Sequence, residues 1–214
     1  MLAEFFSSTP SLKICGVTTP ADARELVSLG VQALGLNFWP KSKRYCAPET
    51  ARTFAPALSG QILRVGVFVN NSRPLAEELF AEGLIDVVQL HGDESPDDIQ
   101  YFLKKSIPVI RAVSALKLPA YDLPSHNFAL LIDTPAGNDY GGTGQTFDWS
   151  IARNFIDSHP GLPVILAGGI TPLNAREALL AAQPVVLDVA SGAEISPGIK
   201  DFEKVKSLLS ITSS

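Results

Sequence analysis

Proton-transferring side chains stand at the ends of short apolar runs in this sequence. Cys15 and Asp133 each end such a run, His91 follows a third, and Asp188 lies near the end of a fourth. Thiol, carboxyl and imidazole groups act as general acids or bases when a site tunes their pKa values towards neutral pH. Local sequence also fits plainer roles, because a lone cysteine is often a small buried hydrophobe and a strand-end aspartate often caps the next turn. Their chemistry therefore depends on whether the fold brings these run ends together.

Glycines follow two apolar runs near the C-terminus. Gly168-Gly169 and Ser191-Gly192 come directly after the last two runs, and residues 141–144 form a third glycine-rich segment that could fold over a ligand. Without a Cβ, glycine adopts positive φ and lets backbone N–H groups converge on an anion. One such pair predicts only a tight turn, but two on adjacent runs favour a phosphate site. The predicted phosphate-binding residues are Gly142, Gly144, Gly168, Gly169, Ser191 and Gly192.

The apolar runs themselves indicate the elements that position these groups. They are short, rich in β-branched residues and apolar on both faces, as is typical of parallel strands covered by helices. The predicted strands span residues 12–15, 33–38, 62–69, 87–90, 109–113, 128–133, 164–167 and 185–189.

Amphipathic stretches separate most of the runs, and several open with proline or acidic residues, which suit the first turn of a helix. The segment 115–125 contains Pro119 and Pro124, so we expect the fifth helix to be short or replaced by a loop. The predicted helices span residues 23–29, 50–57, 75–81, 99–105, 149–158, 173–181 and 201–209.

Eight consecutive strand–helix units in 214 residues predict an α/β fold, a single (β/α)8 TIM barrel, with an open doubly wound sheet as the alternative. We expect a short N-terminal extension over residues 1–11 and one catalytic barrel domain over residues 12–214. Chemistry in such a barrel lies at the C-terminal strand ends, and phosphate binds at the loops after strands seven and eight. Those two loops are the ones that carry the glycine pairs.

The composition limits the classes of partner. Hydrophobic residues make up 46% of the chain, and the net charge is −5 without a basic run, so we expect a filled core and no nucleic-acid partner. No stretch is long and apolar enough to span a membrane, and no signal peptide is expected. Two cysteines without a metal-spaced cluster predict a cytoplasmic protein with no metal site. The expected partner is a small phosphorylated molecule, bound by a monomer or a homodimer.

Over about residues 12–209 the chain resembles the phosphoribosylanthranilate isomerase family, because eight modest motifs follow in the family's order. One departure is visible: the family usually has Asp-Val-Ser-Ser-Gly-Val-Glu after the eighth strand, and this chain has Ala190 in place of the first serine. We expect one side-chain contact to phosphate to be lost there. The motifs lie at residues 13–16, 65–70, 88–94, 133–134, 141–144, 147–149, 166–169 and 197–201.

The resemblance implies an Amadori rearrangement of N-(5-phosphoribosyl)anthranilate to 1-(2-carboxyphenylamino)-1-deoxyribulose 5-phosphate, without a cofactor. An acid protonates the furanose ring oxygen, and a base removes the proton from C2. By resemblance Cys15 is the base and Asp133 is the acid. The site should then lower the pKa of Cys15 and keep Asp133 protonated. We expect Lys13 to lie deeper in the barrel and not to be a direct neighbour of Cys15, with a contribution to the electrostatic field at the thiol left open.

Three further residues are candidates for substrate binding. By resemblance Arg44 would bind the anthranilate carboxylate through its bidentate fork, although its surroundings also fit a solvated surface loop. His91 either orients the ligand or has a structural role, and Asp188 either binds a ribose hydroxyl or lies near Cys15. Arg111 points into the barrel mouth or into its packed interior.

Other functions on the same barrel fit the sequence less well. A histidine-pathway aldose–ketose isomerase is expected to have an aspartate pair at strands one and five, where this chain has Cys15 and Arg111. The indoleglycerol-phosphate synthase of the next pathway step needs a lysine acid and further carboxylates at strand ends. A non-catalytic phospho-ligand sensor needs neither Cys15 nor Asp133. The sequence therefore favours the isomerase.

Overall fold

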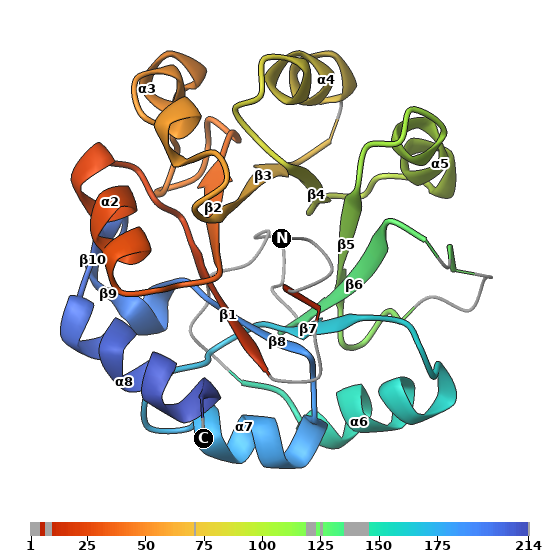
Figure 1. Ribbon diagram of the computed structural model, residues 1–214. Helices are drawn as coiled ribbons and strands as arrows, with labels where there is room; N and C mark the ends of the chain where they lie inside the picture. The colour runs from red at the N-terminus through yellow and green to blue at the C-terminus, as the bar shows by residue number, and fades with distance from the viewer. Residues whose placement is uncertain are drawn as a thin grey trace.

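Eight parallel strands close into a barrel in chain order, with β1 pairing both β2 and β8 (Figure 1). The structure is a computed structural model, and it describes residues 5–6, 10–70, 72–118, 123–124, 126–134 and 146–213. The prediction of a (β/α)8 barrel is confirmed, and the open doubly wound alternative is wrong. The barrel strands are β1 (Ser11–Cys15), β2 (Ala33–Asn37), β3 (Leu63–Phe68), β4 (Val87–Leu90), β5 (Val109–Ser114), β6 (Phe128–Asp133), β7 (Val164–Leu166) and β8 (Val186–Val189).

Helices surround the barrel in Figure 1, and most of them begin earlier than predicted because proline occupies their first turn. The segment predicted as one helix over residues 50–57 is two short helices, since Pro56 has no N–H to continue an α-helix. The helices are α2 (Pro20–Ser28), α3 (Pro48–Arg52), η1 (Ala55–Leu58), α4 (Arg73–Ala81), α5 (Pro96–Lys104), α6 (Trp149–Ser158), α7 (Ala175–Ala182), η2 (Ser191–Ala193) and α8 (Phe202–Thr212).

Two segments depart from the regular strand–helix alternation. Between β5 and β6 the described residues 115–118, 123–124 and 126–127 contain no helix, in keeping with the expected loop. After η2 the chain forms an antiparallel hairpin, β9 (Glu194–Ser196) with β10 (Ile199–Lys200), before α8. The sequence analysis did not anticipate this hairpin.

The core has two parts, because alternate strand side chains point to opposite faces. Outward-facing strand residues pack against the helices in one large cluster. Inward-facing residues such as Val65, Leu131 and Ile165 fill the barrel interior. Phe5, which precedes β1 in the chain, belongs to the interior cluster and is 2% exposed, and its short segment lies within the ring of strands in Figure 1. Phe5 and Phe6 therefore contribute to the packed interior of the barrel.

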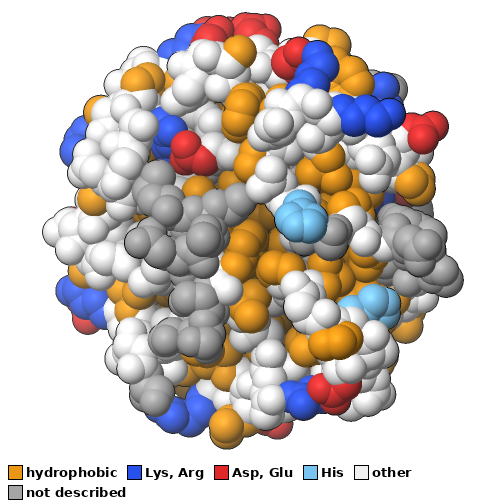
Figure 2. Space-filling model, turned by 45° about the vertical axis from the view of Figure 1, so that its right-hand side comes forward, with side chains coloured by type: hydrophobic (Ala, Val, Ile, Leu, Met, Phe, Trp, Pro, Cys, Tyr) orange, Lys and Arg blue, Asp and Glu red, His pale blue; other side chains and the backbone are white. Residues whose placement is uncertain are grey.

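Charged side chains on the face shown in Figure 2 lie mainly at the rim, where Lys and Arg are interleaved with Asp and Glu. Hydrophobic side chains occupy much of the middle of that face (Figure 2). Among the described residues, no helix combines the length and the apolar character that crossing a membrane requires.

Candidate active site

Four predicted site residues come from the C-terminal ends of barrel strands. Cys15 ends β1 and Asp133 ends β6, while Asp188 lies in β8 and His91 directly follows β4. In the closed barrel, β7 and β8 separate β6 from β1. Cys15 and Asp133 therefore stand on different sides of the barrel mouth, as an acid and a base that act on two parts of one ligand require.

Lys13 lies directly beside Cys15, so the expectation that the two are not neighbours is wrong. The Lys13 side chain is fully buried, and its Nζ donates to Asp188 Oδ1 over 2.8 Å. A Cβ on Gly35 of β2 would lie 2.8 Å from Cys15 Sγ and 3.2 Å from Lys13 Nζ. The missing side chain at Gly35 thus leaves the space in which the sulfur and the amine meet.

Burial raises the pKa of the Cys15 thiol, and Asp188 adds to this effect, while Lys13, Lys200 and Arg44 oppose it. The net direction is upward, so the expectation of a lowered pKa is wrong in this structure. Burial also disfavours the charged form of Lys13, but Asp188 and Cys15 outweigh it and raise the pKa of Lys13. The amine next to the sulfur is therefore held as a cation.

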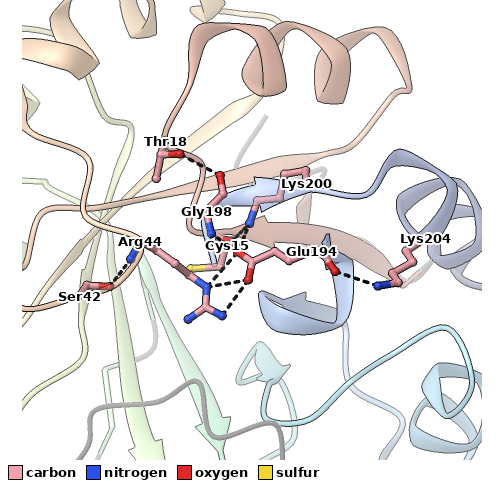
Figure 3. A network of polar contacts seen from close by, with 8 residues as sticks. All are labelled: Cys15, Thr18, Ser42, Arg44, Glu194, Gly198, Lys200 and Lys204. Carbon is pink, nitrogen blue, oxygen red and sulfur yellow. Dashed lines mark hydrogen bonds and ion pairs between the residues drawn. The ribbon is translucent and has the colours of Figure 1, made fainter. Parts of the chain in front are cut away.

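Arg44 reaches the same region from the loop after β2 and is paired with Glu194 (Figure 3). Its Nε lies 2.9 Å and 3.0 Å from the two carboxylate oxygens, and its Nη2 donates over 2.8 Å. Arg44 is largely buried and is not a solvated loop residue. Burial disfavours the charge on Glu194, yet the hydrogen bonds from Arg44 and Lys200 lower the pKa of this carboxyl.

Lys200 completes the group of charges. Its Nζ donates to Glu194 Oε1 over 2.7 Å and to the backbone oxygen of Cys15 over 2.6 Å. Burial lowers the pKa of Lys200, and Glu194 partly offsets that effect. We call Lys13, Arg44, Asp188, Glu194 and Lys200 the charged cluster.

Glu194 and Lys200 were not predicted from the sequence as site residues. Both are nearly fully buried, although charged residues seldom are unless they are paired. They lie in the hairpin after β8, and Lys200 falls in a motif that carried only the family resemblance. A signal was available, because Pro197-Gly198 between Glu194 and Lys200 is a turn dipeptide that fits a tight hairpin, but the hairpin itself was not predicted.

Asp133 contacts a backbone N–H and the His91 imidazole on its side of the mouth. Its Oδ1 accepts from the N–H of Thr134 over 2.7 Å, and its Oδ2 lies 3.3 Å from His91 Nε2. Gln89 Nε2 lies 2.9 Å from the other ring nitrogen, Nδ1. An amide nitrogen only donates, so Nδ1 accepts this hydrogen bond in the tautomer that carries its proton on Nε2, facing Asp133. His91 therefore contacts the candidate acid.

Gln89 is fully buried on β4, and its Oε1 has no hydrogen-bond partner. Reversal of the amide would instead leave its NH₂ group, with two donors, at that unpartnered position. The orientation that donates to His91 is therefore the better satisfied one.

Arg111 faces neither the mouth nor the barrel interior, so both expectations for it are wrong. It alternates along β5 with the inward-facing residues Ile110 and Ala112. Its guanidinium donates to Glu94 Oε2 over 2.5 Å and to the backbone oxygen of Gly92 over 3.0 Å. Arg111 therefore holds the loop that follows β4, next to His91.

The loops after β7 and β8 contact each other, as the phosphate-site prediction requires. Gly168 has a φ of +86°, and a Cβ there would lie 2.1 Å from Thr134 Oγ1 and 2.7 Å from Asp133 Oδ1. A Cβ on Gly192 would lie 1.8 Å from the backbone oxygen of Ile170. These two loops thus pack backbone to backbone beside the candidate acid. Gly169 and Ser191 flank the same contact, whereas Gly142 and Gly144 lie outside the described residues.

Two further features concern these loops and metal binding. Asn174 braces the loop after β7, because its side chain accepts from Thr171 N and donates to the backbone oxygen of Gly169. Within the described part of the chain, no three His, Cys, Asp or Glu side chains are grouped so that they could hold a metal ion.

Comparison with known proteins gives a consistent result. A family model described as N-(5'phosphoribosyl)anthranilate (PRA) isomerase matches residues 12–210. The N-(5'-phosphoribosyl)anthranilate isomerase of Syntrophus aciditrophicus is 40% identical over 201 residues, 92% of this chain and 85% of the relative. The crystal structure of phosphoribosyl anthranilate isomerase from Thermotoga maritima has a TM-score of 0.81 and 35% identity, and the match covers 95% of this chain and 98% of that one.

A related isomerase structure was solved in complex with reduced 1-(o-carboxyphenylamino)-1-deoxyribulose 5-phosphate. It has a TM-score of 0.76 and 33% identity, with 95% of this chain and 97% of that chain covered. The Thermotoga maritima protein is described as dimeric. Because the family model and the relatives each span nearly all of it, the chain belongs to the N-(5'-phosphoribosyl)anthranilate isomerase family and is an isomerase of tryptophan biosynthesis.

Proposed function

We propose that this chain converts N-(5'-phosphoribosyl)anthranilate to 1-(2-carboxyphenylamino)-1-deoxyribulose 5-phosphate, with Asp133 as the general acid and Cys15 as the general base. The observation that carries the assignment is the placement of a thiol and a carboxyl group on different sides of one barrel mouth. Isomerisation needs one proton delivered and one removed, and these two groups supply both.

The acid step opens the sugar ring. Asp133 gives its proton to the ring oxygen, the bond between that oxygen and C1 breaks, and the anthranilate nitrogen forms a double bond to C1. The positive charge that develops on nitrogen makes the proton on C2 more acidic. His91, 3.3 Å from Asp133 Oδ2, keeps the carboxyl group oriented towards the mouth.

The base step completes the rearrangement. The Cys15 thiolate takes the proton from C2, the electrons of the C–H bond form the C1–C2 double bond, and the nitrogen becomes neutral. The resulting enolamine becomes the ketone when C1 gains a proton and the C2 hydroxyl loses one. Asp133 then regains a proton and Cys15 loses one, so the cycle closes without a redox change.

Binding of the two anionic ends of the substrate falls to different loops. Arg44 presents a bidentate fork beside Cys15, and its Nη1 makes none of the contacts to Glu194 described above, so we assign it the anthranilate carboxylate. The contacting loops around Gly168 and Gly192 suit the phosphate, because their backbones approach without side chains between them. Asp188 is assigned to hold Lys13 near Cys15 and not to bind a ribose hydroxyl.

The test is a coupled assay that generates N-(5'-phosphoribosyl)anthranilate in situ and follows the loss of its fluorescence. Enzyme-dependent decay that falls at least about 100-fold in Cys15→Ser supports both the reaction and its base. Cys46→Ser is the matched control, since Cys46 packs in the large cluster between strands and helices, and this variant should retain activity. No decay with a folded protein would favour the sensor function, and an active Cys15→Ser variant would remove Cys15 from the mechanism.

The oligomeric state remains a prediction of a monomer or a homodimer. Size-exclusion chromatography with light scattering measures it directly: a mass near 23 or near 46 kDa fits, since one chain has a mass of 22.8 kDa, and any larger assembly contradicts it.

A further inference from the structure

The Lys13 amine stands between two groups that can be anionic, the Asp188 carboxylate and the Cys15 sulfur. Its Nζ donates to Asp188 Oδ1 over 2.8 Å, and both Nζ and Sγ lie within 3.2 Å of the point that a Gly35 Cβ would occupy. The lysine side chain has no exposed surface and the carboxylate has 7%. Two charges are therefore buried together at the place where the base must ionise.

The charged cluster has an excess of one cation while Cys15 is a thiol. Its cations are Lys13, Arg44 and Lys200, and its carboxylates are Asp188 and Glu194. Ionisation of Cys15 brings the sum of these charges to zero. A buried group of charges is most stable when it is balanced, because water cannot screen an excess.

The partners of the cations differ in how freely they can respond to Cys15. Glu194 engages both Arg44 and Lys200, and Lys200 also binds a backbone oxygen. Lys13 shares the inner face of β1 with Cys15, and Asp188 is its described ion-pair partner. Among the three cations, Lys13 exerts the largest favourable electrostatic effect on the thiolate.

We propose that Lys13 is a positioning residue for the base: its buried ammonium group stabilises the Cys15 thiolate, and Asp188 holds the amine beside the sulfur in both protonation states of Cys15. The inference rests on the proposed role of Cys15. When Cys15 takes the proton from the substrate, Lys13 keeps its bond to Asp188, so the buried amine is never left without a partner. When the thiolate returns, Lys13 faces two anions.

The experiment measures thiolate formation directly, without substrate. The chain has two cysteines, so Cys46→Ala leaves Cys15 as the single thiol. In that background we would follow alkylation of the partly exposed Cys15 by iodoacetamide between pH 6 and 10. The reagent is uncharged, so its rate reports the thiolate population and not attraction of the reagent to the cluster.

Lys13→Met should slow alkylation at pH 8 at least fivefold, with the rates converging with those of the parent at higher pH. Asp188→Asn should accelerate alkylation at least threefold, because it removes an anion near the sulfur. The double variant K13M/D188N distinguishes two effects of Lys13: direct stabilisation of the thiolate, and neutralisation of the Asp188 charge. It should be faster than Lys13→Met and slower than the parent.

Slowing of less than fivefold in Lys13→Met, or restoration of the parent rate in the double variant, would overturn the proposal. Circular dichroism checks folding. If Lys13→Met does not fold, the alkylation rate of Asp188→Asn decides alone. Absence of acceleration in that variant would overturn the proposal. The isomerase assay of Cys15→Ser is independent of these rates. If the alkylation rates show that Lys13 stabilises the Cys15 thiolate but Cys15→Ser is fully active as an isomerase, Cys15 is not the base. The effect of Lys13 on the thiolate would still hold.

Discussion

Cys15 and Asp133, on the two sides of the barrel mouth, have different electrostatic surroundings. The charged cluster lies on the side of Cys15, whereas on the side of Asp133 the described partners are a backbone N–H and the imidazole of His91, whose other nitrogen lies 2.9 Å from Gln89 Nε2. A base must lose its proton where burial opposes charge, so cations are concentrated there. An acid must carry a proton to the substrate, and neighbouring strong cations would favour its ionised form. The difference shows that one barrel mouth holds two local environments.

Removal of the proposed acid, Asp133, should have the largest effect on activity. Asp133→Asn keeps the shape of the side chain and its bond from Thr134 N–H but cannot deliver a proton. We expect kcat to fall by about 10²- to 10⁴-fold, the range of a lost general acid, with an intact fold. Stopped-flow or steady-state kinetics with N-(5'-phosphoribosyl)anthranilate measure it. Activity within tenfold of wild type would mean that another group is the acid.

The charged side should respond to loss of Arg44 mainly in substrate binding. Arg44→Ala removes the proposed carboxylate fork, and a charge-assisted hydrogen bond of about 2 kcal/mol corresponds to a KM increase of about 30-fold. Lys43→Ala, one residue away and exposed, is the matched control and should change KM less than threefold. An unchanged KM in Arg44→Ala would remove Arg44 from the binding site.

The side of Asp133 should be sensitive to Gln89, although Gln89 contacts His91 and not Asp133 itself. Gln89→Leu removes the donor to Nδ1 and frees the ring to move its proton away from Asp133. We expect kcat to fall about fivefold while KM changes little, because one neutral hydrogen bond contributes about 1 kcal/mol. Nitrogen chemical shifts of ¹⁵N-labelled histidine should show the Nε2–H tautomer of His91 in wild type and a mixture in the variant. The Nδ1–H tautomer in wild type would contradict the geometry.

The smallest effect is expected at Ala190, which precedes η2. Its methyl side chain cannot form a hydrogen bond to that turn. Ala190→Ser should restore one hydroxyl donor near the proposed phosphate loops and lower the inhibition constant of inorganic phosphate about two- to fivefold. Ala193→Ser, in the same turn but buried, is a comparison that should bring no such gain. Equal phosphate inhibition in Ala190→Ser and wild type would place Ala190 outside the site.

The barrel and the strand-end candidates could be predicted because they depend on local patterns. Apolar runs buried on both faces indicate parallel strands, and strand ends follow from them. Asp133 and His91 were placed at the mouth in this way, and the structure brings them within 3.3 Å of each other. The observed starts of several helices differ from the predicted ones by a few residues, because proline occupies the first turn of these helices.

The charged side of the site could not be predicted in the same way, because its contacts join distant parts of the chain. Arg44 and Glu194 are 150 residues apart, and Lys200 and Cys15 are 185 apart. Lys13 was misjudged for a different reason. Strand periodicity places its Cα two residues before Cys15, but a flexible four-carbon side chain carries its amine up to the level of the sulfur.

The pairing of β1 with β8 also determines when this enzyme can be completed in the cell. Strand β1 is synthesised before β8 and cannot pair with it until β8 has been made, since Lys13 pairs in register with Asp188, 175 residues later. At about 5 to 20 residues per second, that wait lasts about 10 to 35 s on the ribosome. Until then the lysine amine must stay in water, and the barrel stays open at the β1 edge. Closure of the barrel, burial of the Lys13–Asp188 ion pair and completion of the surroundings of Cys15, the proposed base, therefore occur together after translation of β8.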